Sequence, residues 1–115
     1  MNHYRVALKA DQPLLVELMT ELVTELSPAE GAHSVIQRLD NDVSRGIQAE
    51  STEFFIAECQ GQTAGLARAD ILFEDPIFRM REDHRCGYVD QMYVRTGFRK
   101  RGIGRELLLQ CERWF

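Results

Sequence analysis

Residues 88–108 read YVDQMYVRTGFRKRGIGRELL and decide the fold of this 115-residue chain. The first part, up to Val94, has the aromatic and β-branched residues that are typical of a strand. A polar turn follows at residues 95–101. From Gly102 to Phe115 the apolar residues recur at helical spacing, at Ile103, Leu107, Cys111 and Trp114. The stretch therefore predicts a strand, a basic turn with glycines, and an amphipathic helix, in that order.

The start of this predicted helix has the properties of an anion-binding site. The first N–H groups of a helix have no intrahelical acceptor, and the helix dipole adds partial positive charge there. Gly102 and Gly104 would let the backbone approach a phosphate closely. Positive side chains surround the same turn, at Arg99, Lys100, Arg101 and Arg105. Phosphate binding is therefore the favoured interpretation; a plain helix entry with solvated basic residues is the alternative.

The rest of the chain predicts an α/β fold with a mixed sheet, in the order β-α-α-β-β-β-α. A strand is expected at residues 4–8, and Asp11 is expected to cap a helix that ends before Ser27-Pro28. A second helix carries Ile36, Leu39, Val43 and Ile47 on one face, and Gly46 should weaken its end. Strands are expected at 52–59, in the segment up to Phe73, and at 87–94, with a surface loop at 77–86. These three strands should pair as antiparallel neighbours, and Arg68 and Asp70 should lie on a polar face.

Composition indicates a single domain over residues 1–115, with 44% hydrophobic residues and a net charge of −4. Five basic residues between Arg95 and Arg105 raise the alternative of a nucleic-acid-binding module. Net acidity and the lack of interleaved aromatic residues argue against it, and also against an anionic membrane surface. No apolar run is long enough to span a bilayer. Three unpaired cysteines without a zinc spacing predict reduced thiols, a cytoplasmic location and no metal site: Cys59, Cys86 and Cys111.

The motif Arg99-x-x-Gly102-x-Gly104, placed after the strand Val89–Val94, resembles the acetyl-CoA signature of the GNAT superfamily of N-acetyltransferases. The order of the predicted elements resembles that family along essentially the whole chain. The resemblance implies that backbone amides of the turn hold the CoA pyrophosphate, while the strand end pairs with the pantetheine arm. The residues implied in CoA binding are Met92, Tyr93, Val94, Arg99, Lys100, Arg101, Gly102, Ile103, Gly104 and Arg105.

The family further implies transfer of an acetyl group from acetyl-CoA to a primary amine by direct attack. Asp90 would help to deprotonate the acceptor, although a structural carboxylate is the competing interpretation. The GNAT fold normally continues beyond the position of Phe115, so we expect an incomplete fold, no assignable general acid, and a homodimer that covers the open strand edge. A CoA-binding module without turnover is the alternative to an enzyme.

Overall fold

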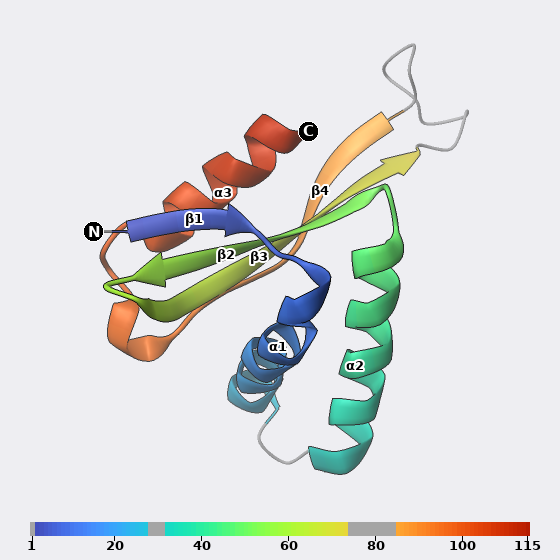
Figure 1. Cartoon of the computed structure of the whole chain (residues 1–115), viewed down its shortest axis with the longest axis horizontal. Coiled ribbons are helices and arrows are strands. Elements are labelled where there is room, and N and C mark those ends of the chain that lie inside the picture. The colour runs from blue at the N-terminus through green and yellow to red at the C-terminus, as the bar shows by residue number, and fades with distance from the viewer. Residues whose placement is uncertain (1, 28–31, 74–84) are drawn as a thin grey trace.

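The computed structural model describes residues 2–27, 32–73 and 85–115, which form one sheet with helices on both faces (Figure 1). Two short 3-10 helices, η1 and η2, accompany the main elements. The predicted α/β class and the predicted order of elements are confirmed. The elements are β1 (Asn2–Val6), η1 (Lys9–Asp11), α1 (Gln12–Leu26), α2 (Ala32–Gln48), β2 (Thr52–Cys59), β3 (Gln62–Phe73), β4 (Arg85–Val94), η2 (Thr96–Phe98) and α3 (Ile103–Trp114).

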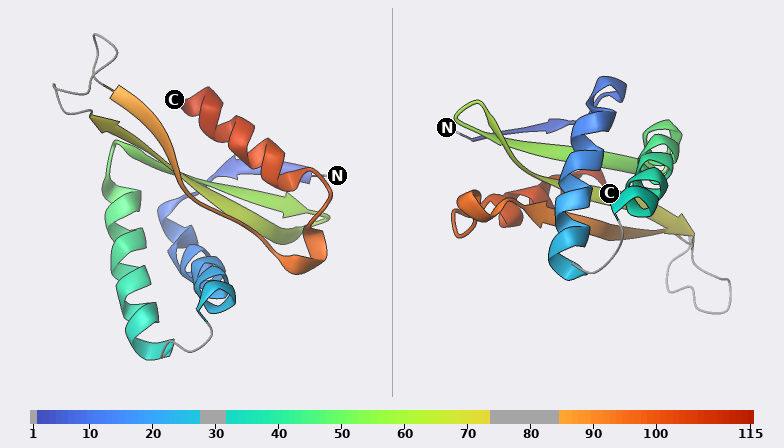
Figure 2. Two further views of the ribbon diagram at one scale, coloured as in Figure 1. Left: turned by 180° about the vertical axis from the view of Figure 1, so that it is seen from behind. Right: turned by 90° about the horizontal axis from the view of Figure 1, so that it is seen from below.

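The four strands of the described sheet lie in sequence order, and each is antiparallel to its neighbour. β2 and β3 are joined by a tight turn in which Gln60 and Gly61 both take left-handed φ angles, of 53° and 78°. The two views of Figure 2 show α3 on one side of the sheet and the α1–α2 pair on the other. The expected antiparallel pairing of the three later strands is confirmed.

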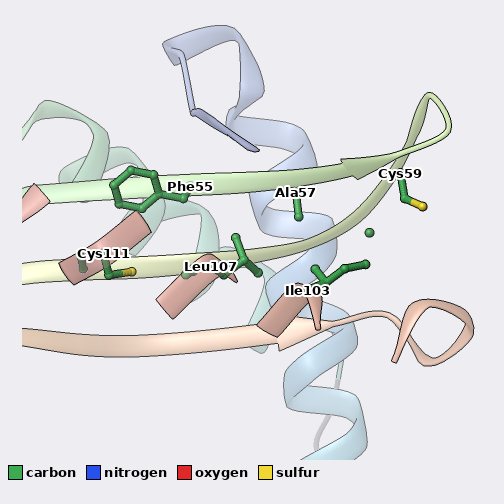
Figure 3. Packing of buried hydrophobic residues seen from close by; sticks show 9 residues of the cluster. Phe55, Ala57, Cys59, Ile103, Leu107 and Cys111 are labelled. Atoms are coloured by element: carbon green, nitrogen blue, oxygen red, sulfur yellow. The ribbon is translucent and has the colours of Figure 1, made fainter. Parts of the chain in front are cut away.

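One hydrophobic core lies between the sheet and α3 (Figure 3). α3 contributes the predicted stripe, and the sheet contributes small residues that let the helix approach closely. Ala57, Ala67 and Ala69 are each no more than 1% exposed. The buried members are Phe55, Ala57, Cys59, Ala64, Ala67, Ala69, Ile103, Leu107 and Cys111. Cys111 is inert in this setting, because burial raises the pKa of its thiol to about 11.

A second core fills the opposite face, between the sheet and the two N-terminal helices. Its buried members are Leu15, Leu18, Met19, Val43, Phe54, Ile56, Leu66 and Tyr93. Helices therefore cover both faces of the central strands, so the polar residues of β3 do not form the separate polar face, distinct from the buried one, that the alternation predicted. Arg68 and Asp70 do alternate with the alanines as predicted, but their side chains are only 12% and 11% exposed. Each is retained there by charged or hydrogen-bonding partners, as burial requires.

Several predicted boundaries are displaced. β1 begins and ends two residues before the predicted strand, and β4 begins two residues earlier. Asp11 does stand at the N-cap of α1, but its carboxylate accepts no hydrogen bond from that helix. It accepts from the Leu8 amide at 2.7 Å and from both terminal nitrogens of Arg5, so it fixes the preceding turn instead. The predicted breaks at Pro28 and at 74–76 lie outside the described residues, as does most of the predicted 77–86 loop.

Gly46 has a packing role rather than the expected weakening role. A Cβ built on Gly46 would lie 2.8 Å from Cε2 of Phe54 and 2.9 Å from its Cζ. Phe54 is 1% exposed and is held in the second core, so its ring has little room to move. Glycine therefore lets α2 lie directly on the aromatic ring, although alanine has the better helix propensity.

We predict that Gly46→Ala lowers the free energy of unfolding by about 1–2 kcal/mol, because overpacking outweighs the gain of about 1 kcal/mol in helix propensity. Gly97→Ala is the matched control, since nothing lies within 4 Å of a Cβ at that position. It should change stability by no more than about 0.5 kcal/mol. Urea unfolding measures both. A Gly46→Ala protein as stable as the parent would show that the ring moves aside.

Candidate functional site

The ladder between β3 and β4 contains one irregularity, and it lies at Asp90. Arg68 is opposite Gln91 and Ala69 is opposite Val89, so Asp90 has no direct partner. An extra residue of this kind is a β-bulge, which reverses the alternation of side chains at that point. Asp90 and Gln91 consequently both lie on the face that α1 and α2 cover. The bulge resolves which face carries the predicted catalytic carboxylate.

The end of β4 presents its main chain to an open strand edge. The Arg95 amide donates to the Ala64 carbonyl at 2.8 Å, so the polar groups of residue 95 point toward β3. By alternation, those of Tyr93 also face β3, while those of Met92 and Val94 face away from it. Among the described residues, β4 pairs with β3 alone. An extended ligand could therefore hydrogen-bond along the edge at Met92 and Val94.

The start of α3 supplies unpaired backbone donors. Gly102 is the N-cap, with a left-handed φ of 81°, and no side chain caps the helix. The first helical hydrogen bond runs from the Glu106 amide to the Gly102 carbonyl at 3.1 Å. The N–H groups of residues 102–105 therefore have no intrahelical acceptor. The remaining left-handed residue of this turn is Lys100, at 65°.

Gly104 brings the helix start and the strand end together. A Cβ at Gly104 would lie 3.7 Å from Sδ of Met92 and 3.8 Å from Cγ2 of Val94. The free amides of α3 and the open edge of β4 thus lie beside each other. Gly97 lies in η2, and a Cβ there would have no atom within 4 Å.

The cationic side chains of the turn differ in how far they are already bonded within the protein. Arg99 donates to the Val94 carbonyl at 2.8 Å and to both carboxylate oxygens of Glu25 at 2.8 Å. Its pKa is raised, chiefly by the bond to Glu25. Arg101 lies 5.5 Å above the centre of the Phe98 ring. The side chains with direct access to solvent at this turn are those of Lys100, Arg101 and Arg105, besides Arg99 itself.

The side chain of Tyr93 has a structural role. It is 6% exposed, and its hydroxyl donates to Glu21 of α1 at 3.2 Å. Burial raises the pKa of the Tyr93 phenol. Glu21 also pairs with Arg95 at 2.8 Å, so α1 is tied to the β4–α3 turn at several points. The sequence did not single out Glu21 or Glu25, because charged residues on a helix usually indicate only a solvated face.

A cluster of three carboxylates surrounds Arg68 on the α1–α2 side of the sheet. Its Nη1 is 2.8 Å from Asp42 of α2, and its Nε is 3.1 Å from Asp70 and 3.5 Å from Asp90. The guanidinium lies over the Phe54 ring, 5.4 Å from its centre. The sequence missed Arg68, Asp70 and Asp42 as site residues. The bulge and the helix crossing that bring them together leave no signal in residue spacing.

The environment of Asp90 favours the protonated carboxyl. Partial burial raises the pKa of Asp90 first, and a hydrogen bond to Asp70 raises it further. Arg68 lowers the pKa, while the charges of Asp70 and Asp42 oppose that effect. The Asp90 side chain is nevertheless 39% exposed, compared with 11% for Asp70. Of the two carboxyls, Asp90 is the one that a substrate could reach.

Two further features lie near this cluster. The Gln91 side chain has a buried Oε1 with no hydrogen-bond partner among the described residues. A groove of about 420 Å³ runs between α1 and α2 and includes Asp42 in its wall. It is lined by Val23, Val35, Arg38, Leu39, Asn41, Asp42 and Arg45. In the described parts of the chain, no three or more His, Cys, Asp or Glu side chains are arranged so that they could hold a metal ion, and none of the helices is long and apolar enough to cross a membrane.

Solved structures with this fold are numerous. A predicted acetyltransferase from Clostridium acetobutylicum with acetyl-CoA superposes with a TM-score of 0.84 at 22% identity, covering 99% of this chain and 73% of that one. An aminoglycoside N-acetyltransferase in complex with CoA gives 0.71 at 22% identity, covering 99% and 68%. A ribosomal-protein-alanine N-acetyltransferase from Brucella melitensis biovar Abortus 2308 gives 0.70 at 18% identity, covering 98% and 70%. No protein of curated function matches in sequence.

The sequence match to a family is extensive. The model of the acetyltransferase (GNAT) family matches residues 15–115, which include most of α1, all of α2, the strands β2 to β4, the whole turn before α3, and α3 itself. This range contains the helix start at Gly104 and the cluster around Arg68. The chain is an enzyme of the GNAT acetyltransferase family.

Proposed function

We propose that this enzyme transfers an acetyl group from acetyl-CoA to a primary amine. The observation that carries the proposal is the close approach at Gly104, where uncapped helix amides adjoin the open edge of β4. The amides of residues 102–105 suit the pyrophosphate, and Lys100, Arg101 and Arg105 add positive charge. The main chain at Met92 and Val94 suits the amide groups of the pantetheine arm, which would lie there like an added strand.

Arg99 has a different role in this proposal from the other cations. It already donates to Glu25 and to the Val94 carbonyl. It therefore shapes the turn rather than contacting phosphate. Tyr93 and Ile103 contribute through backbone alone, because both side chains are buried in the cores. The pairing of Arg95 and Arg99 with α1 carboxylates also reduces the basic surface that a nucleic acid would need.

The chemistry needs proximity, a polarised thioester and an acceptor for a proton. The acceptor ammonium loses one proton to a base, and the lone pair of the resulting neutral amine attacks the thioester carbon. Collapse of the tetrahedral adduct breaks the C–S bond, and the electron pair leaves with sulfur. A second proton from nitrogen then neutralises the thiolate. No covalent intermediate with the enzyme is required, so none of the cysteines needs to be a nucleophile.

Asp90 is our candidate for the first proton acceptor. It is the exposed member of the Arg68 cluster, and it lies on β4 two residues before Met92. The unpartnered Oε1 of Gln91 beside it would accept an N–H from the acceptor or from the pantetheine arm. The names of two similar structures specify an aminoglycoside and an alanine of a ribosomal protein, which supports an amine acceptor here.

We predict that Gly104→Val weakens CoA binding at least roughly tenfold, or about 1.4 kcal/mol, with the fold retained. The reason is that the added methyl groups would stand beside Met92 and Val94, where the backbone must approach the pyrophosphate. Isothermal titration calorimetry with CoA measures the effect. Gly97→Ala, in the same turn, is the control and should bind normally. Unchanged affinity in Gly104→Val would overturn the assignment of this turn to CoA.

We predict that Asp90→Asn lowers kcat/KM for an amine acceptor by roughly a hundredfold at neutral pH, within the usual range for a general base. The loss should shrink at high pH, where the amine is already neutral. Since the pKa of Asp90 is raised, its proton is lost at a higher pH than that of an ordinary aspartate. The parent's activity should therefore rise through that pH, and this rise should be missing in Asp90→Asn. A uniform loss across pH would assign Asp90 a structural role.

Homodimer formation, a cytoplasmic location and a single domain over residues 1–115 stay predictions. The open edge of β4 supports the dimer, as do three large apolar side chains that are 43–53% exposed: Leu72, Tyr88 and Phe115. Leu72 and Tyr88 belong to the same end of the β3–β4 pair, and the Phe115 ring lies against Gly87. We expect sedimentation velocity at micromolar concentration to show a dimer, and a single folded monomeric species would refute it.

A further inference from the structure

Asp70 and Asp90 both lie beside Arg68 but differ in their hydrogen bonds. The Nε of Arg68 donates to Oδ2 of Asp70 at 3.1 Å, whereas it is 3.5 Å from Oδ2 of Asp90, at the distance of an ion pair. Asp70 also accepts a hydrogen bond from the Thr52 hydroxyl at 2.5 Å, on its other oxygen. Both oxygens of Asp70 therefore have donors.

The charges of this cluster do not balance. Arg68 supplies one positive charge, whereas Asp42, Asp70 and Asp90 supply three negative charges when ionised. Asp42 takes the Nη1 side of the guanidinium and is 38% exposed. Two like charges that share a partly buried site favour uptake of a proton by one of them. We expect Asp90 to take up this proton, because both oxygens of Asp70 already accept hydrogen bonds, from Thr52 and Arg68.

The groups that face Asp90 are limited in number among the described residues. β3 contributes Arg68 and Asp70, and α2 contributes Asp42. On β4 itself, Tyr88 lies directly across from Asp70, and Gln91 lies directly across from Arg68. Arg38 and Arg45 line the neighbouring groove with Asp42. Within this set, Asp70 is the carboxylate to which protonated Asp90 can donate a hydrogen bond.

We propose that Asp70 is a positioning residue for the reaction. It holds Asp90 so that, once Asp90 has accepted a proton, the two carboxyls share that proton, while Arg68 lies beside both carboxyls. The proposal rests on the proposed function of Asp90 as the proton acceptor. In the step concerned, an N–H bond of the acceptor ammonium breaks and an O–H bond forms at Asp90. That hydroxyl donates to Asp70, which stays anionic. The nitrogen lone pair is thereby freed for attack on the thioester, and the proton later leaves Asp90 to solvent.

Two substitutions should move the titration of Asp90 in opposite directions. Asp70→Asn removes a negative charge and the charged acceptor, so Asp90 should titrate at lower pH, by about one unit. Thr52→Val is isosteric and removes a donor from Asp70. Asp70 then becomes the stronger acceptor for the shared proton, so the pair should titrate at higher pH. Asp40→Asn is the matched control: Asp40 bonds to Gln12 outside the cluster, so the titration should not move.

The measurement is a pH titration of the carboxyl carbons in protein labelled with ¹³C-aspartate, in which the Asp90 signal is identified by its absence from Asp90→Asn. Equal titration in the parent, Asp70→Asn and Thr52→Val overturns the proposal. If Asp70→Asn does not fold, Thr52→Val alone decides, because it leaves every charge in place. A shift to higher pH supports the pair, and no shift or a shift to lower pH rejects it.

A second readout separates this proposal from the proposed function. In the parent and in the folded variants, the acid limb of kcat/KM should move with the NMR titration, down in Asp70→Asn and up in Thr52→Val. Absence of acetyl transfer to any amine would refute the proposed function, while the NMR shifts would still decide on the carboxyl pair. Acetyl transfer whose acid limb is the same in all variants would keep the function and reject the role of Asp70.

Discussion

The pairing of β3 with β4 is the constraint on which the rest of the structure depends. Its pleat distributes side chains to two covered faces, with Ala67 and Ala69 beneath α3 and Leu66 and Tyr93 beneath the N-terminal helices. A strict alternation would continue this pattern to the end of the strand. The bulge at Asp90 interrupts it once, so two consecutive polar residues reach the same face. The proposed CoA site and the proposed proton acceptor thus both depend on this one strand, with Met92 and Val94 next to α3 and Asp90 on the other face of the sheet.

Electrostatics connects α1 to the turn before α3. Glu21 and Glu25 lie one helical turn apart on α1, and they hold Arg95 and Arg99 at 2.8 Å. These pairs are partly exposed, so each contributes little to the stability of the fold by itself. Their effect is geometric, because they fix the turn between the end of β4 and the free amides of α3. A ligand group that takes the Val94 carbonyl must first replace the Arg99 donor, so binding there is an exchange of hydrogen bonds rather than a simple gain.

The features of this protein that depend on local residue patterns could be predicted from the sequence. The stripe of Ile103, Leu107 and Cys111 defined α3, and the motif from Arg99 to Gly104 indicated the family. The sequence could not predict that the polar residues of β3 are buried, because alternation alone does not say whether a helix covers the second face. Gly46 was misread for a related reason. Whether a glycine is needed depends on what its missing side chain would meet, and that is a tertiary property.

The Phe54 ring contacts two different parts of the molecule. One edge of its ring meets α2 at Gly46, and one face lies beneath the guanidinium of Arg68. The position of α2 on this ring therefore affects the charged cluster, since a helix that is pushed outward would carry Asp42 away from Arg68. Substitutions that improve the helix or enlarge the core at this point would alter the balance of charge around Asp90 without touching a charged residue. A substitution at this aromatic ring would therefore change both the stability of the fold and the charge around Asp90.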